Sequence, residues 1–166
     1  RSELLFARRV ILVEGISEAV LLPAIAERFL KDDPQRLRKF KACTTIIVGS
    51  VDFEPYIKLL THPSPNQQSI VEKLVLLTDG DPNMDGAANS SARGSEYEET
   101  DRFCRVVSPY TLEVSLLGDA SENIDLLKAA YLQQHSRSQD KWDKINDSET
   151  PQRTMYTMMG QNQSAS

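Results

Sequence analysis

The sequence has few of the residues on which several common classes of protein depend. Its 166 residues include two cysteines, two histidines and one tryptophan. Cys43 and Cys104 share no metal-ligand spacing and fall in or beside apolar runs, so we interpret them as reduced, structural thiols. No apolar run approaches the roughly 18 residues of a membrane-spanning helix, and the first residues do not form a signal peptide. We therefore expect a cytoplasmic protein that has no membrane partner.

Positive charge is also in short supply. The chain has 19 lysine and arginine residues against 24 aspartate and glutamate residues, and its net charge is −5. This is the wrong sign for a protein that holds DNA or RNA mainly by its own basic surface. If a nucleic acid is the substrate, other domains or bound cations must offset the charge.

The chain does have enough apolar sequence for one α/β domain. Hydrophobic residues make up 40% of it. Four short apolar runs predict buried strands, and they cover residues 8–15, 44–48, 71–77 and 102–107. Gly15 and Gly49 close the first two runs, as expected where a strand enters a loop before a helix.

Helical spacing follows the first of these runs. We predict a helix that begins at Ser17 as its N-cap. Its apolar face would consist of Ala19, Leu22, Ile25, Ala26 and Phe29. Pro23 should kink its first turns unless the regular helix begins near this proline. The segment from Asp32 to Pro34 should end the helix, and the polar residues up to Lys41 are predicted to form a connection.

Three more helices are predicted, over residues 53–60, after Thr111 and over residues 124–134. Residues 61–69 and 82–102 have the composition of loops. Beyond about Ser136 the pattern weakens. We therefore expect one domain over residues 1–140, followed by an extension or a poorly ordered tail over residues 141–166.

The alternation of strands and helices favours an α/β fold with a Rossmann-like, mostly parallel sheet and helices on both faces. Ligand sites in such sheets gather at the carboxyl ends of the strands. Four residues with chemistry of interest fall at these predicted ends: Glu14, Gly49, Asp79 and Asp81.

Acidic side chains at these strand ends need a positive partner, because burial disfavours an unpaired carboxylate. A divalent cation such as Mg²⁺ takes oxygen ligands and suits such a site. Glu14 and Glu18 lie four positions apart across a strand-to-helix turn, so they can face one pocket. Taken alone, Glu18 could equally be a first-turn acid that complements the helix dipole, and Asp79-Gly80-Asp81 could be a turn. Together, the two pairs favour a metal site.

Three motifs carry a family resemblance, and they occur in order along the chain. They are Val13-Glu14-Gly15 with Glu18, the strand end Leu76-Leu77-Thr78-Asp79-Gly80-Asp81, and Tyr110-Thr111-Leu112-Glu113. Over about residues 8 to 130 the chain resembles the Toprim domain, in particular the version in OLD-family (overcoming lysogenization defect) ATP-dependent endonucleases. The resemblance implies a Toprim-type fold and an enzyme that hydrolyses DNA, or RNA, with two Mg²⁺ or Mn²⁺ ions.

The resemblance also assigns roles to residues. It implies that Glu14, Glu18, Asp79 and Asp81 bind the catalytic metals, with Glu14 also able to handle a proton. Glu113 would add a ligand for the second ion. Gly15 and Gly49 would support the strand ends. Thr111 could orient Glu113 or a water molecule, and it fits equally well as the N-cap of the following helix.

OLD-family nucleases couple this domain to an ATPase, yet the sequence contains no P-loop. The resemblance therefore implies a fragment of a longer protein. Its own N-terminal ATPase domain would bind ATP, form a homodimer and provide much of the grip on DNA. The family is also expected to place a basic residue late in the domain. Lys128, Lys141 and Lys144 are candidates, although each also fits a solvated surface lysine.

Several alternatives remain open at this stage. Another Toprim enzyme, of the primase or topoisomerase type, would share the acidic residues, although Glu18 stands where those enzymes more often have aspartate. A Toprim-like module could also be a non-catalytic nucleic-acid scaffold. A haloacid-dehalogenase-like phosphatase would use Asp79 and Asp81, but that family carries the motif on its first strand and leaves Glu14 without a role.

Two further patterns are weaker. Residues 81–86 resemble the start of a calcium-binding loop, but Ala92 occupies the position that requires a closing glutamate. Trp142 lies between lysines and could stack on nucleic acid, although a hydrophobic contact explains it more simply.

Overall fold

The computed structural model describes residues 7–62, 69–80, 97–118 and 123–163, and the chain divides into two compact units. The first unit ends at Ser108 and the second begins at Pro109. The domain boundary expected from the sequence, between residues 140 and 141, falls inside helix α6 (Gln139–Asn146) of the second unit.

The first unit is built around a parallel sheet. Its strands are β1 (Arg9–Val13), β2 (Thr44–Ile47), β3 (Lys73–Asp79) and β4 (Phe103–Ser108), in the order β2-β1-β3-β4. All three pairings are parallel. The four predicted strands and the predicted α/β fold are therefore confirmed. This order also places the reversal of the sheet's winding between β1 and β3, which is where open parallel sheets bind their ligands.

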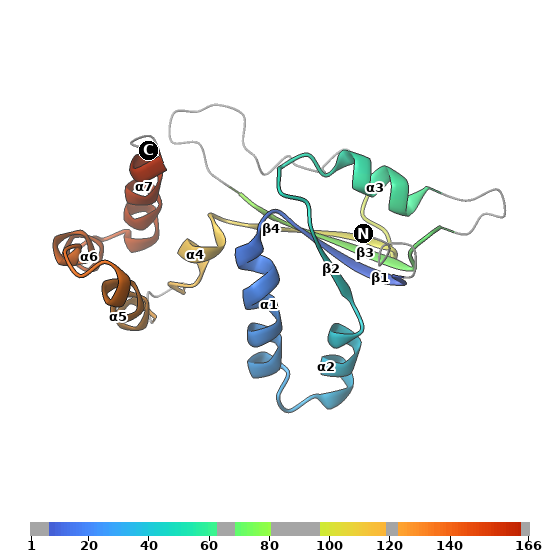
Figure 1. The fold of residues 1–166 in the computed structure, drawn as a ribbon, viewed down its shortest axis with the longest axis horizontal. Coiled ribbons are helices and arrows are strands. Elements are labelled where there is room, and N and C mark those ends of the chain that lie inside the picture. The colour runs from blue at the N-terminus through green and yellow to red at the C-terminus, as the bar shows by residue number, and fades with distance from the viewer. Residues whose placement is uncertain (1–6, 63–68, 81–96, 119–122, 164–166) are drawn as a thin grey trace. The chain divides into compact units, whose positions relative to one another are not determined.

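Helices cover both faces of this sheet. Figure 1 shows α1 (Ile16–Phe29) and α2 (Pro34–Lys41) on one side of the strands and α3 (Glu54–Thr61) on the other. The chain steps from β1 to β2 in one direction and from β2 to β3 in the other. Because parallel crossovers are right-handed, this reversal moves the helices from one face to the opposite face.

The main core lies between the sheet and α3. Alternate residues of the strands point to this face, and they pack against one side of α3. The buried members of the cluster are Ala7, Val10, Leu12, Ile46, Phe53, Ile57, Leu60, Val71, Leu74, Leu76 and Phe103. β3 shows the alternation clearly, since Leu74, Leu76 and Thr78 are buried and the residues between them are not. The strands are therefore fixed in register by one apolar face.

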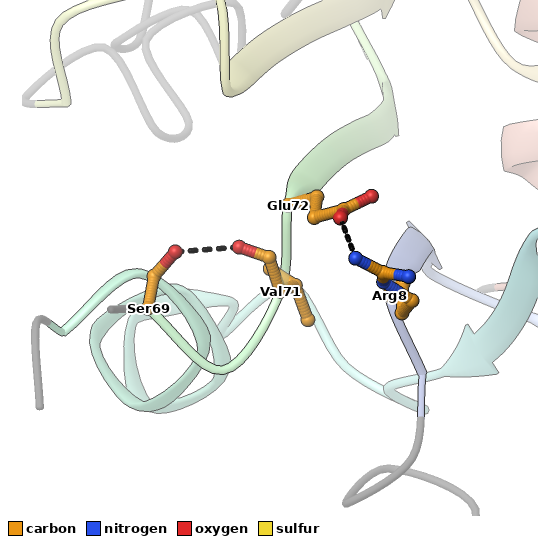
Figure 2. Close-up of polar contacts among 4 residues, drawn as sticks. All are labelled: Arg8, Ser69, Val71 and Glu72. Atoms are coloured by element: carbon orange, nitrogen blue, oxygen red, sulfur yellow. Dashed lines mark hydrogen bonds and ion pairs between the residues drawn. The ribbon is translucent and has the colours of Figure 1, made fainter.

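At the amino ends of β1 and β3, polar contacts hold the two strands together. The carbonyl of Arg8 accepts hydrogen bonds from the N–H groups of Glu72, at 2.7 Å, and Lys73, at 3.3 Å. Figure 2 shows the ion pair between the Arg8 and Glu72 side chains, and the bond from the Ser69 hydroxyl to the Val71 carbonyl, at 2.6 Å. Both charged side chains are exposed, so the pair adds little stability and mainly aligns the strand ends.

The start of α1 differs from the prediction. Its N-cap is Gly15, not Ser17, and the helix begins at Ile16. Pro23 lies inside the helix, well after its first turn. The predicted apolar face is partly wrong, because Phe29 is 81% exposed and Ile25 is 40% exposed. The face of α1 that packs on the sheet is therefore narrower than the apolar spacing suggested.

Residues 34–41, predicted to be a connection, form α2. The carboxylate of Asp33 caps this helix by accepting a hydrogen bond from the N–H of Arg36, at 2.9 Å, and Pro34 occupies its first turn. The two cysteines are free. Cys43 is half-buried and its burial raises the pKa of its thiol, whereas Cys104 is exposed, contrary to its expected burial.

The second unit is helical. It contains α4 (Leu112–Ser115), α5 (Ile124–Gln134), α6 and α7 (Pro151–Gln163), of which α4 and α5 were predicted. Its core is a cluster of Val114, Leu117, Trp142, Ile145 and Met155. Trp142 is 3% exposed, which confirms the hydrophobic contact expected for it. Among the described residues of the chain, no helix is both long enough and apolar enough to span a membrane.

The core between the sheet and α3 can be tested by comparing a buried leucine with an exposed one. Leu12→Ala should lower the free energy of unfolding by about 2 to 5 kcal/mol, because Leu12 is fully buried and its truncation leaves a cavity. Leu59→Ala, at a side chain 55% exposed on α3, should cost less than about 0.5 kcal/mol. Urea unfolding followed by far-ultraviolet circular dichroism compares the two. Equal losses would contradict this assignment of the core.

Candidate functional site

The carboxylate of Glu14 lies over the carboxyl end of β3. Glu14 directly follows β1, and the register Val13↔Leu77 brings it level with Thr78 of the neighbouring strand. Its Oε1 atom accepts a hydrogen bond from the hydroxyl of Thr78 and another from the N–H of Asp79, at 3.2 Å. The Glu14–Thr78 pair thus continues the row of buried cross-strand pairs formed by Leu12 and Leu76.

The main chain of Glu14 is held from the other side. Its carbonyl accepts a hydrogen bond from the N–H of Gly49, at 2.9 Å, and the carbonyl of Val13 accepts one from Val48, also at 2.9 Å. Gly49 has φ of 77°, in the left-handed region that favours glycine. The turn after β2 therefore meets the turn after β1, as the placement of Gly49 at a strand end predicted.

Glu18 closes the turn between Glu14 and α1. It is 7% exposed, and its Oε2 atom accepts a hydrogen bond from the N–H of Gly15, at 3.0 Å. A Cβ atom added at Gly15 would lie 3.2 Å from this oxygen, so the glycine leaves room for the carboxylate. Of the two interpretations of Glu18, the helix-terminal role is thus directly visible.

The second oxygen of Glu18 remains available to a ligand. Among the described residues, Gly15 is the only hydrogen-bond donor to this carboxylate. No fully buried side-chain oxygen of the described residues lacks a partner. Oε1 has no partner within the described part of the chain, so this atom is not fully buried. The capping role and a ligand role are therefore compatible.

Asp79 is the last residue of β3, and it pairs with Ser108 of β4. It is half-buried and, by strand alternation, belongs to the sheet face opposite Thr78, which is the face that α1 covers. Asp81 lies outside the described residues. Within the described part of the chain, no three acidic, histidine or cysteine side chains are close enough together to hold a metal ion.

The chemistry of the donors nevertheless suits a hard divalent cation. Glu14, Glu18 and Asp79 offer carboxylate oxygens at or beside the carboxyl ends of β1 and β3. Mg²⁺ and Mn²⁺ prefer oxygen ligands of this kind and retain several water molecules, so they do not need a complete protein cage.

Glu113 belongs to the second unit, on α4. It is half-buried and lines a cavity of about 180 Å³ together with Tyr131, Lys141, Trp142, Ile145, Met155, Met158 and Met159. Thr111 is the N-cap of α4, where its hydroxyl accepts a hydrogen bond from the N–H of Val114, at 3.4 Å. The capping role proposed for Thr111 is thus confirmed. Among the described residues, no bond joins Thr111 to Glu113.

The late basic candidates differ in their surroundings. Lys128 forms an ion pair with Asp143, at 3.0 Å. The hydrogen bond that Lys128 donates, and to a lesser extent the one from Gln139, lower the pKa of the Asp143 carboxyl. Lys141 lines the cavity beside Glu113, and Lys144 is exposed. Lys128 is therefore already engaged in a structural pair.

Comparisons with known proteins agree with this architecture. Residues 5–81 match the family model described as "Overcoming lysogenization defect protein-like, TOPRIM domain". This segment is an OLD-like Toprim domain. The match includes the first four predicted metal ligands and ends at Asp81, so Glu113 lies outside it.

Two solved structures of one OLD protein resemble the chain beyond the Toprim segment. One structure of the C-terminal region of the Xanthomonas campestris pv. campestris OLD protein has a TM-score of 0.56 and 25% identity, and covers 87% of this chain and 72% of its own. A second structure of that region has a TM-score of 0.52 and 24% identity, and the match covers 86% of this chain and 72% of the solved one. The C-terminal region of the Burkholderia pseudomallei OLD protein has a TM-score of 0.48 and 26% identity, and the match covers 75% of this chain and 65% of the solved one. No curated protein sequence matches the chain.

Sequence reasoning missed one residue of the candidate site. Thr78 is 2% exposed, and its hydroxyl donates to the carboxylate of Glu14. The available signal was its position: a hydroxyl residue ending the buried row of β3, directly before the Asp79-Gly80-Asp81 motif. A buried hydroxyl at that place needs an acceptor, and Glu14 is the acid at the end of the adjacent strand.

Glu18 offers a test that separates its cap from any charge-dependent role. Glu18→Ala should lower the free energy of unfolding by about 0.5 to 2 kcal/mol, because the N–H of Gly15 loses its acceptor. Glu18→Gln should retain most of that stability, since its amide oxygen can still accept the bond. Urea midpoints of the two variants give the comparison. If Gln proved as costly as Ala, the cap would not account for the burial of Glu18.

Proposed function

We propose that the chain is the catalytic domain of a metal-dependent endonuclease that hydrolyses phosphodiester bonds of DNA. The observation that carries the proposal is the fixed carboxylate of Glu14 at the reversal point between β1 and β3, directly beside Asp79. The OLD-like Toprim family supports a nucleic-acid-related function, and Toprim domains generally bind divalent metals. Glu14, Glu18, Asp79, Asp81 and Glu113 are the proposed ligands of Mg²⁺ or Mn²⁺.

When bound, two such ions would activate the attacking water and stabilise the leaving oxygen of the phosphodiester. The contribution of the chain itself is to hold its acidic side chains in fixed orientations. Thr78 and the main-chain N–H of Asp79 fix one oxygen of Glu14, so this carboxylate keeps a single orientation. We also assign to Glu14 the role that the family resemblance implies, acceptance of a proton from the nucleophile.

Glu18 would complete the first half of the site. Its Oε2 atom is occupied by the N–H of Gly15, and Oε1 is not fully buried. A carboxylate that caps a helix with one oxygen can offer the other to a cation at little cost in reorganisation. Asp79 and Asp81 would provide the second half from the end of β3, and Glu113 from α4 would serve the second ion.

The remaining partners follow from the same proposal. An ATPase domain elsewhere in the full-length protein would bind ATP, mediate homodimerisation and bring additional contacts to DNA. The net charge of −5 supports this division of work, because an acidic module cannot bind a phosphate backbone strongly by itself at physiological salt. RNA is the alternative substrate, because the acidic ligands do not distinguish ribose from deoxyribose.

Metal binding is the most direct test. Calorimetric titration with Mn²⁺ and Mg²⁺ should show saturable binding to the unmodified chain. Glu14→Ala and Asp79→Ala should each weaken it at least about tenfold, because even loss of a supporting partner costs a metal site that much. Nicking of supercoiled plasmid in Mn²⁺ should fall in parallel.

Glu72→Ala is the matched control for these variants. Glu72 is an exposed acid at the opposite, amino end of β3, where it pairs with Arg8. Its removal should leave the metal titration unchanged. Flat titrations for a folded, unmodified chain would sink the proposal and favour a non-catalytic nucleic-acid scaffold.

Thr78 permits a finer test of how Glu14 is positioned. Thr78→Val preserves the shape of the side chain but removes the hydroxyl that donates to Glu14. Metal affinity should fall about 10- to 100-fold, as for other residues that orient a ligand. Thr78→Ser should restore most of it, because serine keeps the donor.

Urea unfolding of the same Thr78 variants separates positioning from stability. Thr78→Val should remain folded, since valine suits a buried strand position. If Thr78→Val bound Mn²⁺ as tightly as the unmodified chain, the hydroxyl would have no part in positioning Glu14.

A further inference from the structure

Helix α2 concentrates positive charge in an acidic chain. Its eight residues include Arg36, Arg38, Lys39 and Lys41 and no acid. All four side chains are exposed. The chain has a net charge of −5, so the residues outside this helix carry a net charge of −9. The helix is thus a local exception to the charge of the molecule.

Three of these cations have no ionic partner among the described residues. Lys41 pairs with Glu27 of α1, at 2.7 Å, and this contact lowers the pKa of Glu27. Asp33 accepts a hydrogen bond from the main-chain N–H of Arg36 as the helix cap. The side chains of Arg36, Arg38 and Lys39 form no ion pair with any described acid. Their charge therefore faces solvent.

The helix itself does not require this accumulation. Basic residues in the last turn complement the helix dipole, but the dipole amounts to about half a charge. Like charges three or four positions apart, such as Arg36 with Lys39, repel each other and destabilise a helix by a few tenths of a kcal/mol. An external anion that relieves this repulsion would be bound favourably.

The exposed face of α2 suits a polyanion better than a protein surface. Leu37 and Phe40 are half-buried, so apart from Pro34 in the first turn the outer face consists of charged and polar side chains. Protein interfaces normally have an apolar or aromatic centre, and this face has none. Arginine and lysine on an exposed helix are the usual contacts to phosphate oxygens.

We propose that α2 binds the sugar-phosphate backbone of the nucleic acid, with Arg36, Arg38 and Lys39 each neutralising about one phosphate. Arg36 to Lys39 rise about 4.5 Å along the helix axis, and their long side chains extend this reach toward the roughly 7 Å over which three successive phosphates of one strand rise. α1 begins beside Glu14 and ends at the turn into α2 (Figure 1). Since α1 is about 21 Å long, a duplex that reached from the site to this turn would span about six base pairs. The inference rests on the proposed function and adds the surface on which the substrate would lie.

Fluorescence anisotropy with a labelled duplex of about 30 base pairs tests this surface over about 20 to 200 mM KCl. EDTA is present throughout, so the result does not depend on the metal site. The combined variant Arg36→Gln, Arg38→Gln and Lys39→Gln should bind at least tenfold more weakly at the lowest salt. Its slope of log affinity against log salt should be smaller than that of the unmodified chain by about 2 to 3, because each lost phosphate contact contributes about 0.9.

A matched control removes the same charge elsewhere in the first unit. Lys58→Gln, Lys73→Gln and Arg102→Gln replace three exposed cations outside α2, and this variant should keep the original slope. Equal losses in the two variants would show an effect of net charge alone and overturn the proposal. Absence of measurable binding by the unmodified chain at the lowest salt would overturn it as well. The Mn²⁺ titration of the α2 variant should be unchanged, which separates failure of this surface from failure of the proposed function.

Discussion

The parallel pairing of β1 with β3 is the interaction on which the rest of the site depends. It sets Val13 opposite Leu77, and the next step along both strands sets Glu14 beside Thr78. Because side chains alternate along a strand, a shift of one residue would turn Thr78 away from Glu14 and expose the buried row that contains Leu76. The same apolar face that stabilises the fold therefore determines the geometry of the carboxylate.

The strands could be predicted from the sequence because each is a short apolar run, and burial on a parallel sheet requires such runs. Helix α2 could not be predicted in this way. Its apolar residues, Leu37 and Phe40, are too few to give a helical period, and its real signals are the Asp33 cap and Pro34 in the first turn. Spacing also overestimated the buried face of α1, since Phe29 is repeated at helical spacing yet is exposed.

The candidate site shows a similar division. Acidic residues at the ends of apolar strands can be recognised in the sequence. Burying an unpaired carboxylate costs free energy, so such a residue needs a positive partner, and this made Glu14 and Asp79 candidates. The hydrogen bonds that orient them are not visible, because they depend on which strand lies next to which. Thr78 was missed for this reason, and the contact of Glu18 with Gly15 could be foreseen only as one of two roles. Asp81 remains a prediction, since it lies outside the described residues.

Glu14 is held at both of its polar ends, by Gly49 at the carbonyl and by Thr78 and Asp79 at the carboxylate. Its side chain therefore loses its rotational freedom when the domain folds, before any ligand arrives. A flexible glutamate would lose about 1 kcal/mol or more of conformational entropy at the moment of binding. Here that entropy is lost when the sheet forms, and the hydrogen bonds from Thr78 and Asp79 offset the loss. A ligand that binds only the folded domain would raise its stability, so the domain should resist unfolding most when the ligand is bound.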